Sequence, residues 1–325
     1  MKALFVATKG DDQQLEYGDV AEPEILESTD VIVRVRATAL NRLDMFRLMG
    51  SHGVTPPKFP YVGGSEYAGD VVEVGSAVSH LRTGDRVFGT ASHTFADYAL
   101  VREAGRGPHQ RPPLKMPPGL SYEEAAAIPI SFCMAWHMLY CKGQLVGGED
   151  VLVMGGGSGT GTSGIQLAML AGARVITTAS TDEKLEKAKA LGVDDTFNYR
   201  EIGAFSQTVR DMTGGKGVDM VFEHIGAPVW EECFKSLKRG GRLIICGVTG
   251  GHWAKIHLGQ VWSRNLAIIG CTNEPENDFE QIVPLVGRGL IRGIVDSVFP
   301  LESGQEAYTR MEARDYFGKI VLQVP

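Results

Sequence analysis

Val151-Leu152-Val153-Met154, followed directly by Gly155-Gly156-Gly157-Ser158-Gly159-Thr160-Gly161, is the stretch from which the fold can be read. Four consecutive apolar residues predict a strand that is buried on both faces of a sheet. A glycine-rich turn lets backbone N–H groups approach a pyrophosphate, and a helix expected over 162–170 adds a partial positive charge at its N-terminus. The alternative is a flexible loop between packed elements. The residues of this turn that we predict to bind a dinucleotide are Gly155, Ser158, Gly159, Thr160 and Gly161.

The residues after the turn support this interpretation more strongly than the glycine motif does. The literal pattern G-x-G-x-x-G occurs only as Gly159, Gly161 and Gly164, which is weak evidence by itself. Strands and helices then alternate. The segments expected to be strands are 174–178, 195–197, 219–222, 242–245 and 266–269, with a helix over 182–191. Together with the first strand they predict an α/β fold with a doubly wound, parallel, six-stranded sheet of the Rossmann type.

The N-terminal part of the chain has β periodicity instead. Between Val31 and Ala37, apolar residues alternate with Arg34 and Arg36, as in a strand with one buried face. Further strands are expected over 67–74, 85–88 and 97–101. Short strands at this spacing predict a small antiparallel barrel or sandwich.

The composition excludes several classes of protein. A length of 325 residues suggests about two domains, and 32 basic against 39 acidic residues give a net charge of −7, which argues against a nucleic-acid-binding protein. No apolar run reaches the roughly 18 residues of a membrane span, and the first residues lack the pattern of a secretory signal. Five scattered cysteines fit a reducing compartment. We therefore expect a soluble, cytoplasmic protein without a nucleic-acid or membrane partner.

The cysteine and histidine positions do not predict a metal site. Cys133 is the first cysteine of the chain and no C-x2-C pair occurs, so a zinc ion held by cysteines is not expected. His52, His80, His93 and His109 lack the i, i+4 spacing of a helical metal pair. Their plain alternative is a surface or loop position, and we expect no metal ligand among them.

The end of the second strand of the α/β part bears on the choice of dinucleotide. NAD-selective sites place Asp or Glu there, whereas this chain has Thr178-Ala179-Ser180-Thr181. Ser180, Lys184 and Tyr199 could instead surround a 2′-phosphate. The alternative for Ser180 is helix capping, since Ser180-x-x-Glu183 forms a capping box, and Lys184 could simply be exposed. The pattern favours NADP(H) over NAD(H).

Six segments spread over the chain have the character of family signatures. They are Ala39-Leu40-Asn41-Arg42-Leu43-Asp44, Gly63-Gly64-Ser65-Glu66-Tyr67-Ala68-Gly69, Gly84-Asp85-Arg86-Val87, the turn at 155–161, Gly240-Gly241-Arg242 and Phe317-Gly318-Lys319-Ile320-Val321-Leu322. Together they resemble the medium-chain dehydrogenase/reductase superfamily, especially its zinc-independent quinone oxidoreductase branch. The resemblance implies a GroES-like β domain, 1–125 and 273–325, interrupted by a Rossmann domain, 126–272. It also implies a homodimer or homotetramer, often joined near 266–269.

The same resemblance implies that a catalytic zinc is missing. Zinc-dependent alcohol dehydrogenases of the superfamily hold the metal through Cys, His and Cys, and the matching positions here are Asn41, Ser65 and Ile130. Glu66, the acid beside the family's His ligand, remains. Without a metal to polarise the reacting oxygen, a quinone or an α,β-unsaturated carbonyl is the easier hydride acceptor, because its developing charge is delocalised and modest donors suffice. We therefore expect an NADPH-dependent, zinc-independent reductase of quinones or activated alkenes.

The candidate catalytic residues each have a structural alternative. Asn41 could donate its amide to the substrate oxygen or to the nicotinamide ribose, or it could cap the adjoining turn. Asp44 stands near an expected helix start, where a carboxylate also serves as an N-terminal cap. Tyr61 is a candidate acid or hydrogen-bond donor, or an aromatic that packs beside Pro60.

Further residues are expected around the nicotinamide and the substrate. By resemblance, the backbone of Cys246-Gly247-Val248 meets the nicotinamide amide; a reactive thiol at Cys246 is the alternative, for which the sequence offers no basic partner. Phe46, Met134 and Trp262 could form an apolar wall for a flat acceptor, and core packing is the alternative for each.

Two other functions remain open. One is a metal-free carbonyl or enoyl-thioester reductase, in which Arg102, Arg106 and Arg111 of the loop at 102–113 contact a charged substrate tail; a solvated loop is the alternative. The other is a crystallin-like protein that binds NADPH without turnover. An acceptor panel separates both from a quinone reductase.

Overall fold

The computed structural model describes residues 1–8, 14–49, 58–103, 111–193, 195–272 and 278–325. The chain divides into two compact units. Unit 1 comprises Met1–Ile130 and Glu274–Pro325, and unit 2 comprises Ser131–Asn273. The helix α3 (Pro129–Trp136) carries the chain from one unit into the other. Within these ranges, no helix combines the length and the apolar character needed to cross a bilayer.

Unit 2 is built on one parallel sheet of six strands. Its strands are β9 (Asp150–Val153), β10 (Arg174–Ala179), β11 (Asp195–Asn198), β12 (Val218–Glu223), β13 (Leu237–Ile245) and β14 (Ala267–Gly270). They lie in the order β11-β10-β9-β12-β13-β14. From β9 the chain adds β10 and β11 on one side, and then returns to add β12, β13 and β14 on the other side of β9, as in a doubly wound sheet. The predicted Rossmann-type sheet is thus confirmed, with each expected strand present and most of them extended by one or more residues.

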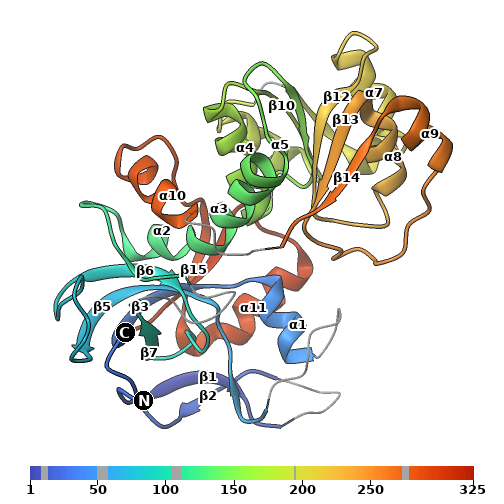
Figure 1. Ribbon diagram of the computed structural model, residues 1–325. Coiled ribbons are helices and arrows are strands. Elements are labelled where there is room, and N and C mark those ends of the chain that lie inside the picture. The colour runs from blue at the N-terminus through green and yellow to red at the C-terminus, as the bar shows by residue number, and fades with distance from the viewer. Residues whose placement is uncertain (9–13, 50–57, 104–110, 194, 273–277) are drawn as a thin grey trace. The chain divides into compact units, whose positions relative to one another are not determined.

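Helices cover both faces of this sheet. Figure 1 shows α4 (Gly159–Leu170) and α5 (Asp182–Lys189) on one side of the strands, and α7 (Phe205–Met212) and α8 (Trp230–Ser236) on the other. Coverage on both sides explains why the strands are apolar throughout: Val151, Leu152 and Val153 are wholly buried. The remaining elements of the unit are a π-helix at His137–Lys142, α6 (Tyr199–Ile202) and α9 (Leu258–Arg264).

Unit 1 contains a seven-stranded sheet and a smaller one of three strands. The larger sheet follows the order β15-β16-β3-β5-β6-β8, with β7 paired to β3, and the smaller follows β2-β1-β4. The strand bounds are β1 (Lys2–Val6), β2 (Glu16–Asp19), β3 (Asp30–Ala39), β4 (Tyr61–Val62), β5 (Glu66–Val74), β6 (Arg86–Thr90), β7 (Tyr98–Arg102), β8 (Leu114–Lys115), β15 (Val295–Pro300) and β16 (Lys319–Gln323). Unit 1 also contains α1 (Arg42–Met49), α2 (Tyr122–Ala126), α10 (Asp278–Gly287), a 3-10 turn at Leu301–Ser303 and α11 (Gly304–Ala313).

The four strands expected in the N-terminal part are β3, β5, β6 and β7, which pair antiparallel with one another. Along β3, Val33, Val35 and Ala37 are wholly buried, whereas Arg34 and Arg36 are partly exposed, as the alternation predicted. The sequence did not indicate the short strands β1, β2 and β4.

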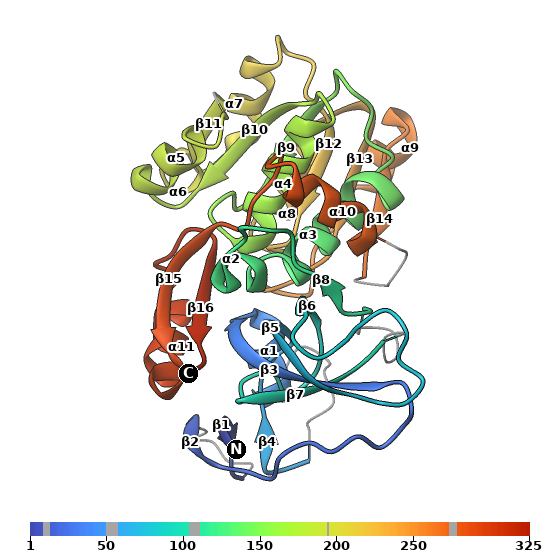
Figure 2. The same cartoon turned by 90° about the vertical axis from the view of Figure 1, so that its left-hand side faces the viewer.

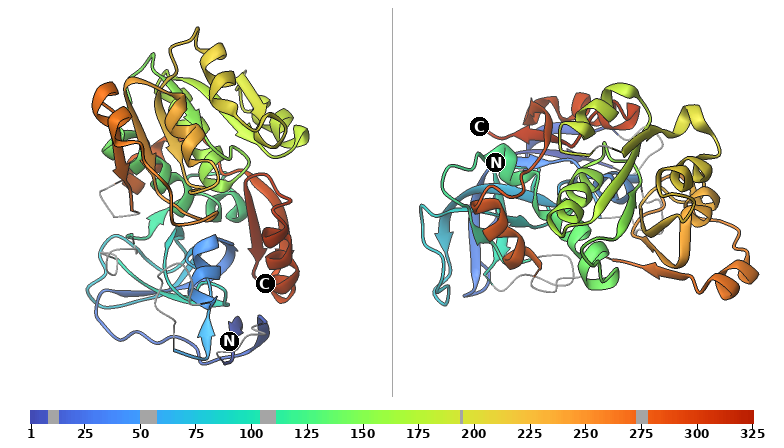
Figure 3. Two further views of the ribbon diagram at one scale, coloured as in Figure 1. Left: turned by 90° about the vertical axis from the view of Figure 1, so that its right-hand side faces the viewer. Right: turned by 90° about the horizontal axis from the view of Figure 1, so that it is seen from above.

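The C-terminal segment returns to the N-terminal strands. The strands β15 and β16 run parallel, lie side by side, and have α11 beside them (Figure 2). The view from the opposite side gives the same arrangement (Figure 3). The pairing of β16 with β3 is antiparallel and sets Val321 opposite Ala39. The backbone N–H of Leu40 donates to the carbonyl of Ile320 at 3.0 Å, so the first residue of β16, Lys319, lies beside the start of α1.

Candidate functional site

The phosphate turn joins β9 to α4. The helix α4 begins at Gly159, so Gly159, Gly161 and Gly164 lie inside its first turns, earlier than the expected start at 162. Ser158 caps the helix, because its hydroxyl accepts from the N–H of Gly161 at 2.9 Å. This position, at the carboxyl end of the central strand and the N-terminus of a helix, is where open α/β sheets bind phosphate groups.

The turn is too tight for side chains. A Cβ atom on Gly161 would lie 2.2 Å from the carbonyl oxygen of Gly155, and one on Gly156 would lie 2.3 Å from the hydroxyl oxygen of Thr177. Gly155 itself has φ of +59°. At Gly164 a Cβ atom would meet the ring of Phe222 at 3.0 Å, so glycine there lets the helix approach the sheet closely. These residues fit a dinucleotide pyrophosphate.

The end of β10 carries no carboxylate. Its last residue, Ala179, pairs with Asn198 of β11, so Ser180 and Tyr199 follow two neighbouring strand ends. Lys184 stands in the first turn of α5. The helix cap is Thr181, whose hydroxyl accepts from the N–H of Lys184 at 3.4 Å. The capping role considered for Ser180 is therefore wrong, because β10 extends to Ala179 and shifts the cap by one residue.

Two ionisable side chains lie at the carboxyl edge of the sheet: Cys246, which is partly buried, and Glu223, which is wholly buried. Cys246, Gly247 and Val248 follow β13, and the N–H of Cys246 donates to the carbonyl of Glu223 at 3.2 Å. Burial raises the pKa of the Cys246 thiol well above its ordinary value, which disfavours a reactive thiolate here. The Glu223 carboxylate accepts from the backbone N–H groups of Ile225 at 2.6 Å and Gly226 at 3.0 Å. Burial nevertheless raises its pKa to about 7.

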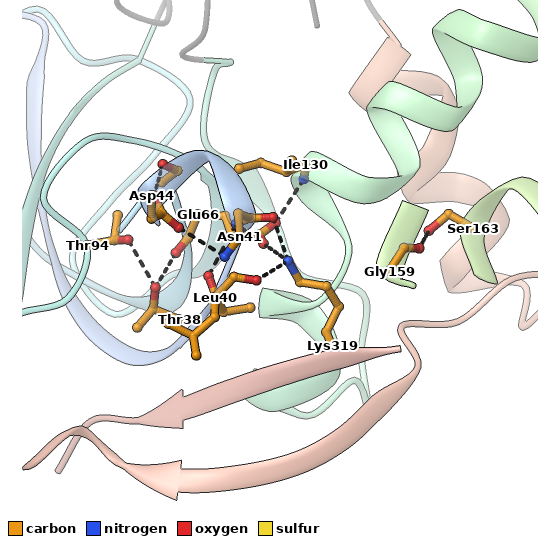
Figure 4. Close-up of polar contacts among 12 residues, drawn as sticks. Thr38, Leu40, Asn41, Asp44, Glu66, Thr94, Ile130, Gly159, Ser163 and Lys319 are labelled. Carbon is orange, nitrogen blue, oxygen red and sulfur yellow. Dashed lines mark hydrogen bonds and ion pairs between the residues drawn. The ribbon is translucent and has the colours of Figure 1, made fainter. Parts of the chain in front are cut away.

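In unit 1, the ammonium group of Lys319 is held by three oxygens. It donates to the carbonyl of Leu40 at 2.8 Å, to Oδ1 of Asn41 at 2.6 Å and to Oε1 of Glu66 at 2.8 Å (Figure 4). The Lys319 side chain is 6% exposed and that of Glu66 is wholly buried. All three N–H bonds of the ammonium are thus satisfied inside the protein.

The Glu66 carboxylate gathers donors from three distant segments. Besides Lys319, it accepts from the amide of Asn41 at 2.8 Å and from the N–H of Ile130 at 2.9 Å. The other contact of the Asn41 amide nitrogen is the carbonyl of Ala39, at 3.3 Å. The Asn41 side chain is therefore engaged on both its nitrogen and its oxygen. It positions the loop before α1 and caps no helix.

This arrangement does not fit a zinc ion. Of the positions that match the metal ligands of zinc dehydrogenases, Asn41 directs its oxygen at an ammonium, Ser65 donates its hydroxyl to Asp44, and Ile130 offers only an alkyl side chain. Among the residues that the structure describes, no three His, Cys, Asp or Glu side chains converge. Oxygens already held by a buried cation are not available to a second one.

Asp44 begins a second polar cluster. Its carboxylate accepts from the N–H of Asn41 at 3.1 Å and from the hydroxyl of Ser65, and that hydroxyl in turn accepts from Nη1 of Arg47 at 3.0 Å. Burial raises the pKa of Asp44 to about 6, while Ser65, Arg47 and Lys319 act in the opposite direction. Burial raises the pKa of Tyr61, a partly buried residue, and the nearby charge of Arg47 acts in the opposite direction. The structure thus brings Asn41, Asp44 and Tyr61 into adjoining clusters.

The apolar candidates have different environments. Phe46 packs against the core of unit 1, and Met134 is partly buried on α3. Trp262 lies on α9 and is 81% exposed, so the core-packing alternative for this residue is wrong.

The arginines considered for a substrate tail have internal partners. Arg111 is buried and pairs through two nitrogens with Asp278, at 2.8 and 2.6 Å. Arg102 ends β7 and pairs with Glu27 and Asp30. The solvated loop was therefore wrong for Arg111, since its guanidinium ties the segment to α10. Arg106 lies outside the described residues, as do His52 and His109.

The sequence analysis did not identify Lys319 or Arg47 as site residues. It named Glu66 but did not predict its structural role. A signal for the first existed, because a lysine in the apolar run that follows Gly318 needs a buried counter-ion. No pattern indicated which acid would supply the counter-ion, since Lys319 and Glu66 are far apart in the chain.

Comparisons with known proteins agree with the fold of both units. A family model described as a zinc-binding dehydrogenase matches residues 159–288, and one described as an alcohol dehydrogenase GroES-like domain matches residues 27–136. A zinc-type alcohol dehydrogenase-like protein of Schizosaccharomyces pombe is 30% identical over 96% of this chain and 95% of its own length. The quinone oxidoreductase of Homo sapiens is 28% identical over 99% and 97%.

Solved structures give the same picture. One described as an NAD-dependent alcohol dehydrogenase has a TM-score of 0.91 and 35% identity, with 100% of both chains covered. A mycobacterial protein complexed with NADPH has a TM-score of 0.87 and 26% identity, covering 99% of this chain and 100% of its own. The β domain is thus of the GroES-like kind, as expected, and a nicotinamide cofactor is supported.

Proposed function

Because the chain belongs to the medium-chain dehydrogenase/reductase superfamily, as a quinone oxidoreductase-like oxidoreductase, we propose that it is an NADPH-dependent reductase of quinones or α,β-unsaturated carbonyls that works without zinc. The observation that carries the proposal is the Lys319 ammonium, bound by Asn41 and Glu66 beside the positions where zinc dehydrogenases hold their metal. The site has its own positive charge, so it offers no vacancy for a divalent ion.

The proposed substrate class follows from what this chain can stabilise. A reduced nicotinamide, when bound, supplies hydride. A plain ketone needs strong polarisation of its oxygen, normally from a metal. In a quinone or an enone the developing charge is spread over a conjugated system, so hydrogen-bond donors such as Tyr61 can hold it. The residues we propose for the apolar wall of the substrate site are Phe46, Met134 and Trp262.

The choice of NADPH rests on the end of β10. Ser180, Lys184 and Tyr199 offer a hydroxyl, an ammonium and a phenol near this end, and the residues at the strand end itself, Thr178 to Thr181, include no carboxylate. A relative in complex with NADPH is consistent with this choice. Cys246, Gly247 and Val248 are the proposed backbone contacts of the nicotinamide amide. We also propose a reducing, cytoplasmic location and a homodimer or homotetramer.

The selectivity can be tested on one helix. Lys184→Gln should raise the KM for NADPH about tenfold or more and leave the KM for NADH within twofold. The reason is that only NADPH carries a 2′-phosphate, whose ion pair with Lys184 the substitution removes. Lys187→Gln is the matched control, since Lys187 is partly exposed on the same helix and pairs with Glu183 at 2.7 Å. Equal effects of the two variants on NADPH would contradict the assignment.

The runner-up functions are less well supported. A reductase that grips a charged tail through the segment at 102–113 has lost two of its three candidate arginines, because Arg102 and Arg111 pair with internal carboxylates. A crystallin-like protein that binds NADPH without turnover has no particular structural feature in its favour.

The decisive assay follows NADPH oxidation with 1,4-benzoquinone and with 2-cyclohexenone, before and after exhaustive treatment with a chelator. We expect turnover that the chelator does not change. An enoyl thioester and a plain ketone serve as comparison substrates. Turnover that disappears with the chelator and returns with zinc would refute the proposal, as would NADPH binding without oxidation by any acceptor.

A further inference from the structure

A ladder of polar groups runs from the interior of unit 1 to Tyr61. Arg47 donates from Nη1 to the hydroxyl of Ser65 at 3.0 Å, and Ser65 donates to the carboxylate of Asp44. The charge of Arg47 also acts on the nearby Tyr61, where it opposes the rise in pKa that burial causes. Arg47 and Ser65 both donate toward the buried Asp44 carboxylate, so the first bond polarises the second. The ladder therefore fixes the guanidinium group on the side that faces Ser65 and Asp44.

The guanidinium has more donors than the described protein uses. Arginine carries five N–H bonds and stays charged. In the described part of the chain, no carboxylate lies within ion-pair distance of Arg47, and the hydrogen bond that its guanidinium donates goes to Ser65. Arg47 and Tyr61 are both partly exposed, unlike Asp44 and Ser65 behind them. A cation anchored at the back, with donors left at the front, is suited to an anionic oxygen.

The two cations near Asn41 have different surroundings. Lys319 donates its three N–H bonds to protein oxygens, so none is left for a ligand. In Figure 4, Lys319 and Asp44 lie on opposite sides of Asn41. Arg47 is on the Asp44 side, bonded to the Ser65 that occupies a metal-ligand position. Of the two charges, only the one at Arg47 can serve a substrate.

We propose that the Arg47 guanidinium, together with the Tyr61 hydroxyl, holds the oxygen of the acceptor as it becomes an anion. This inference rests on the proposed function. When hydride adds to the β-carbon of an enone, the C=C electron pair moves to form the enolate, and the charge arrives on the oxygen held by Arg47. A proton from water then completes the reduction at the α-carbon. In a quinone, the same donors hold the hydroquinone monoanion. Arg47 would thereby supply the polarising charge that zinc supplies in related dehydrogenases.

The first test measures anion binding without turnover. The probe is 4-nitrophenol, which resembles a hydroquinone and turns yellow as the phenolate. We expect the wild-type protein to bind the phenolate at least tenfold more tightly than the neutral phenol, and Arg47→Gln to lose this preference. Arg42→Gln is the matched control on the same helix, because Arg42 contacts only the carbonyl of Met311, at 3.4 Å, in the described structure. Equal phenolate preference in Arg47→Gln and the wild type would overturn the inference.

The second test uses the reaction. Arg47→Gln should lower kcat/KM for 2-cyclohexenone about 100-fold, with unchanged NADPH affinity and an unchanged unfolding midpoint. Arg47→Lys should recover part of the loss, because the charge returns without the planar fork. If Arg47→Gln retains wild-type kcat/KM, the inference fails while the proposed function stands. If the wild type reduces no acceptor but binds the phenolate through Arg47, the proposed function fails while the oxyanion site stands. If no phenolate binds to the wild type, the inference fails.

Discussion

At the scale of single residues, a buried ion pair stands out in unit 1. The buried pair of Lys319 and Glu66 is held by several further hydrogen bonds, from Asn41 and Ile130 to the carboxylate and from the ammonium to Leu40. A pair of this kind contributes little net stability relative to apolar residues, yet removal of one partner leaves an uncompensated buried charge. The pair therefore behaves as a unit, and its members are best tested together.

Lys319→Met should destabilise the protein by about 3–5 kcal/mol in urea unfolding, because Glu66 would lose its only ion-pair partner in the described structure. The double variant Glu66→Gln with Lys319→Met should recover most of that loss. Lys235→Met is the control, since Lys235 pairs with Glu231 at a partly exposed position and should cost less than about 1 kcal/mol. A double variant as unstable as Lys319→Met would contradict the interpretation.

Asp44 gives the stability of the protein a pH dependence. Its pKa rises from 3.8 to about 6 on folding because it is buried, so its protonated form is favoured in the folded state. The stability from this group is complete below pH 3.8 and is lost as pH rises through about 6, by about 3 kcal/mol. The free energy of unfolding of Asp44→Asn, subtracted from that of the wild type between pH 4 and 7, should show this decline. A constant difference over that range would count against a raised pKa.

Among the elements, the turn between β9 and α4 has the least tolerance for change. Ser158 caps α4 at the carboxyl end of β9; a Cβ atom on Gly161 would collide with the backbone of Gly155, and one on Gly156 would collide with the Thr177 side chain. The same geometry that leaves no room for a Cβ atom exposes the N–H groups needed by a pyrophosphate. Cofactor binding and local packing therefore depend on the same atoms.

Gly161→Ala should weaken NADPH binding more than tenfold, because its Cβ atom would lie 2.2 Å from the carbonyl oxygen of Gly155 and force the turn open. Quenching of nicotinamide fluorescence measures the affinity. Gly287→Ala in α10 is the control: its Cβ atom would make ordinary contacts at 3.6 Å with Pro117, so binding should not change. Unaltered affinity in Gly161→Ala would mean that the turn does not contact the cofactor.

For the molecule as a whole, the surface of unit 2 bears on assembly. Trp253, Leu258 and Trp262 are 93%, 75% and 81% exposed, and they belong to the segment between β13 and β14. The strand β14 ends the sheet order, so one side of it has no partner strand within the described chain. Exposed apolar side chains next to an open strand edge favour association with a second copy.

Leu258→Glu combined with Trp253→Glu should convert the proposed homo-oligomer to a monomer, as measured by light scattering after size exclusion. Val146→Glu is the control, because Val146 is 63% exposed in a different segment of the same unit and should leave the assembly intact. A wild-type protein that is already monomeric at micromolar concentration would refute the expectation of a homo-oligomer.

Local order along the chain was enough to establish most of the architecture. The apolar strand at 151–153, the glycine turn and the alternation after it depend on neighbours in sequence, and they predicted the six-stranded sheet that the structure has. The prediction that no zinc binds at Asn41, Ser65 and Ile130 also rests on residue type alone, and it stays a prediction. The cap at Thr181 and the early start of α4 were missed by one to three residues, since strand ends depend on pairing.

The ion-pair partners of the buried charged residues could not be predicted from the sequence. Lys319 meets Glu66 because β16 and β5, which carry these residues, both pair with β3, and Arg111 meets Asp278 although the two are 167 residues apart in the chain. No periodicity encodes such pairs, because burial and counter-ions are properties of the folded neighbourhood. Contacts that form only when distant strands come together determine the remaining features of the site. These features are the hydrogen bonds of the Asn41 side chain, the raised pKa of Asp44 and the ladder from Asp44 to Arg47.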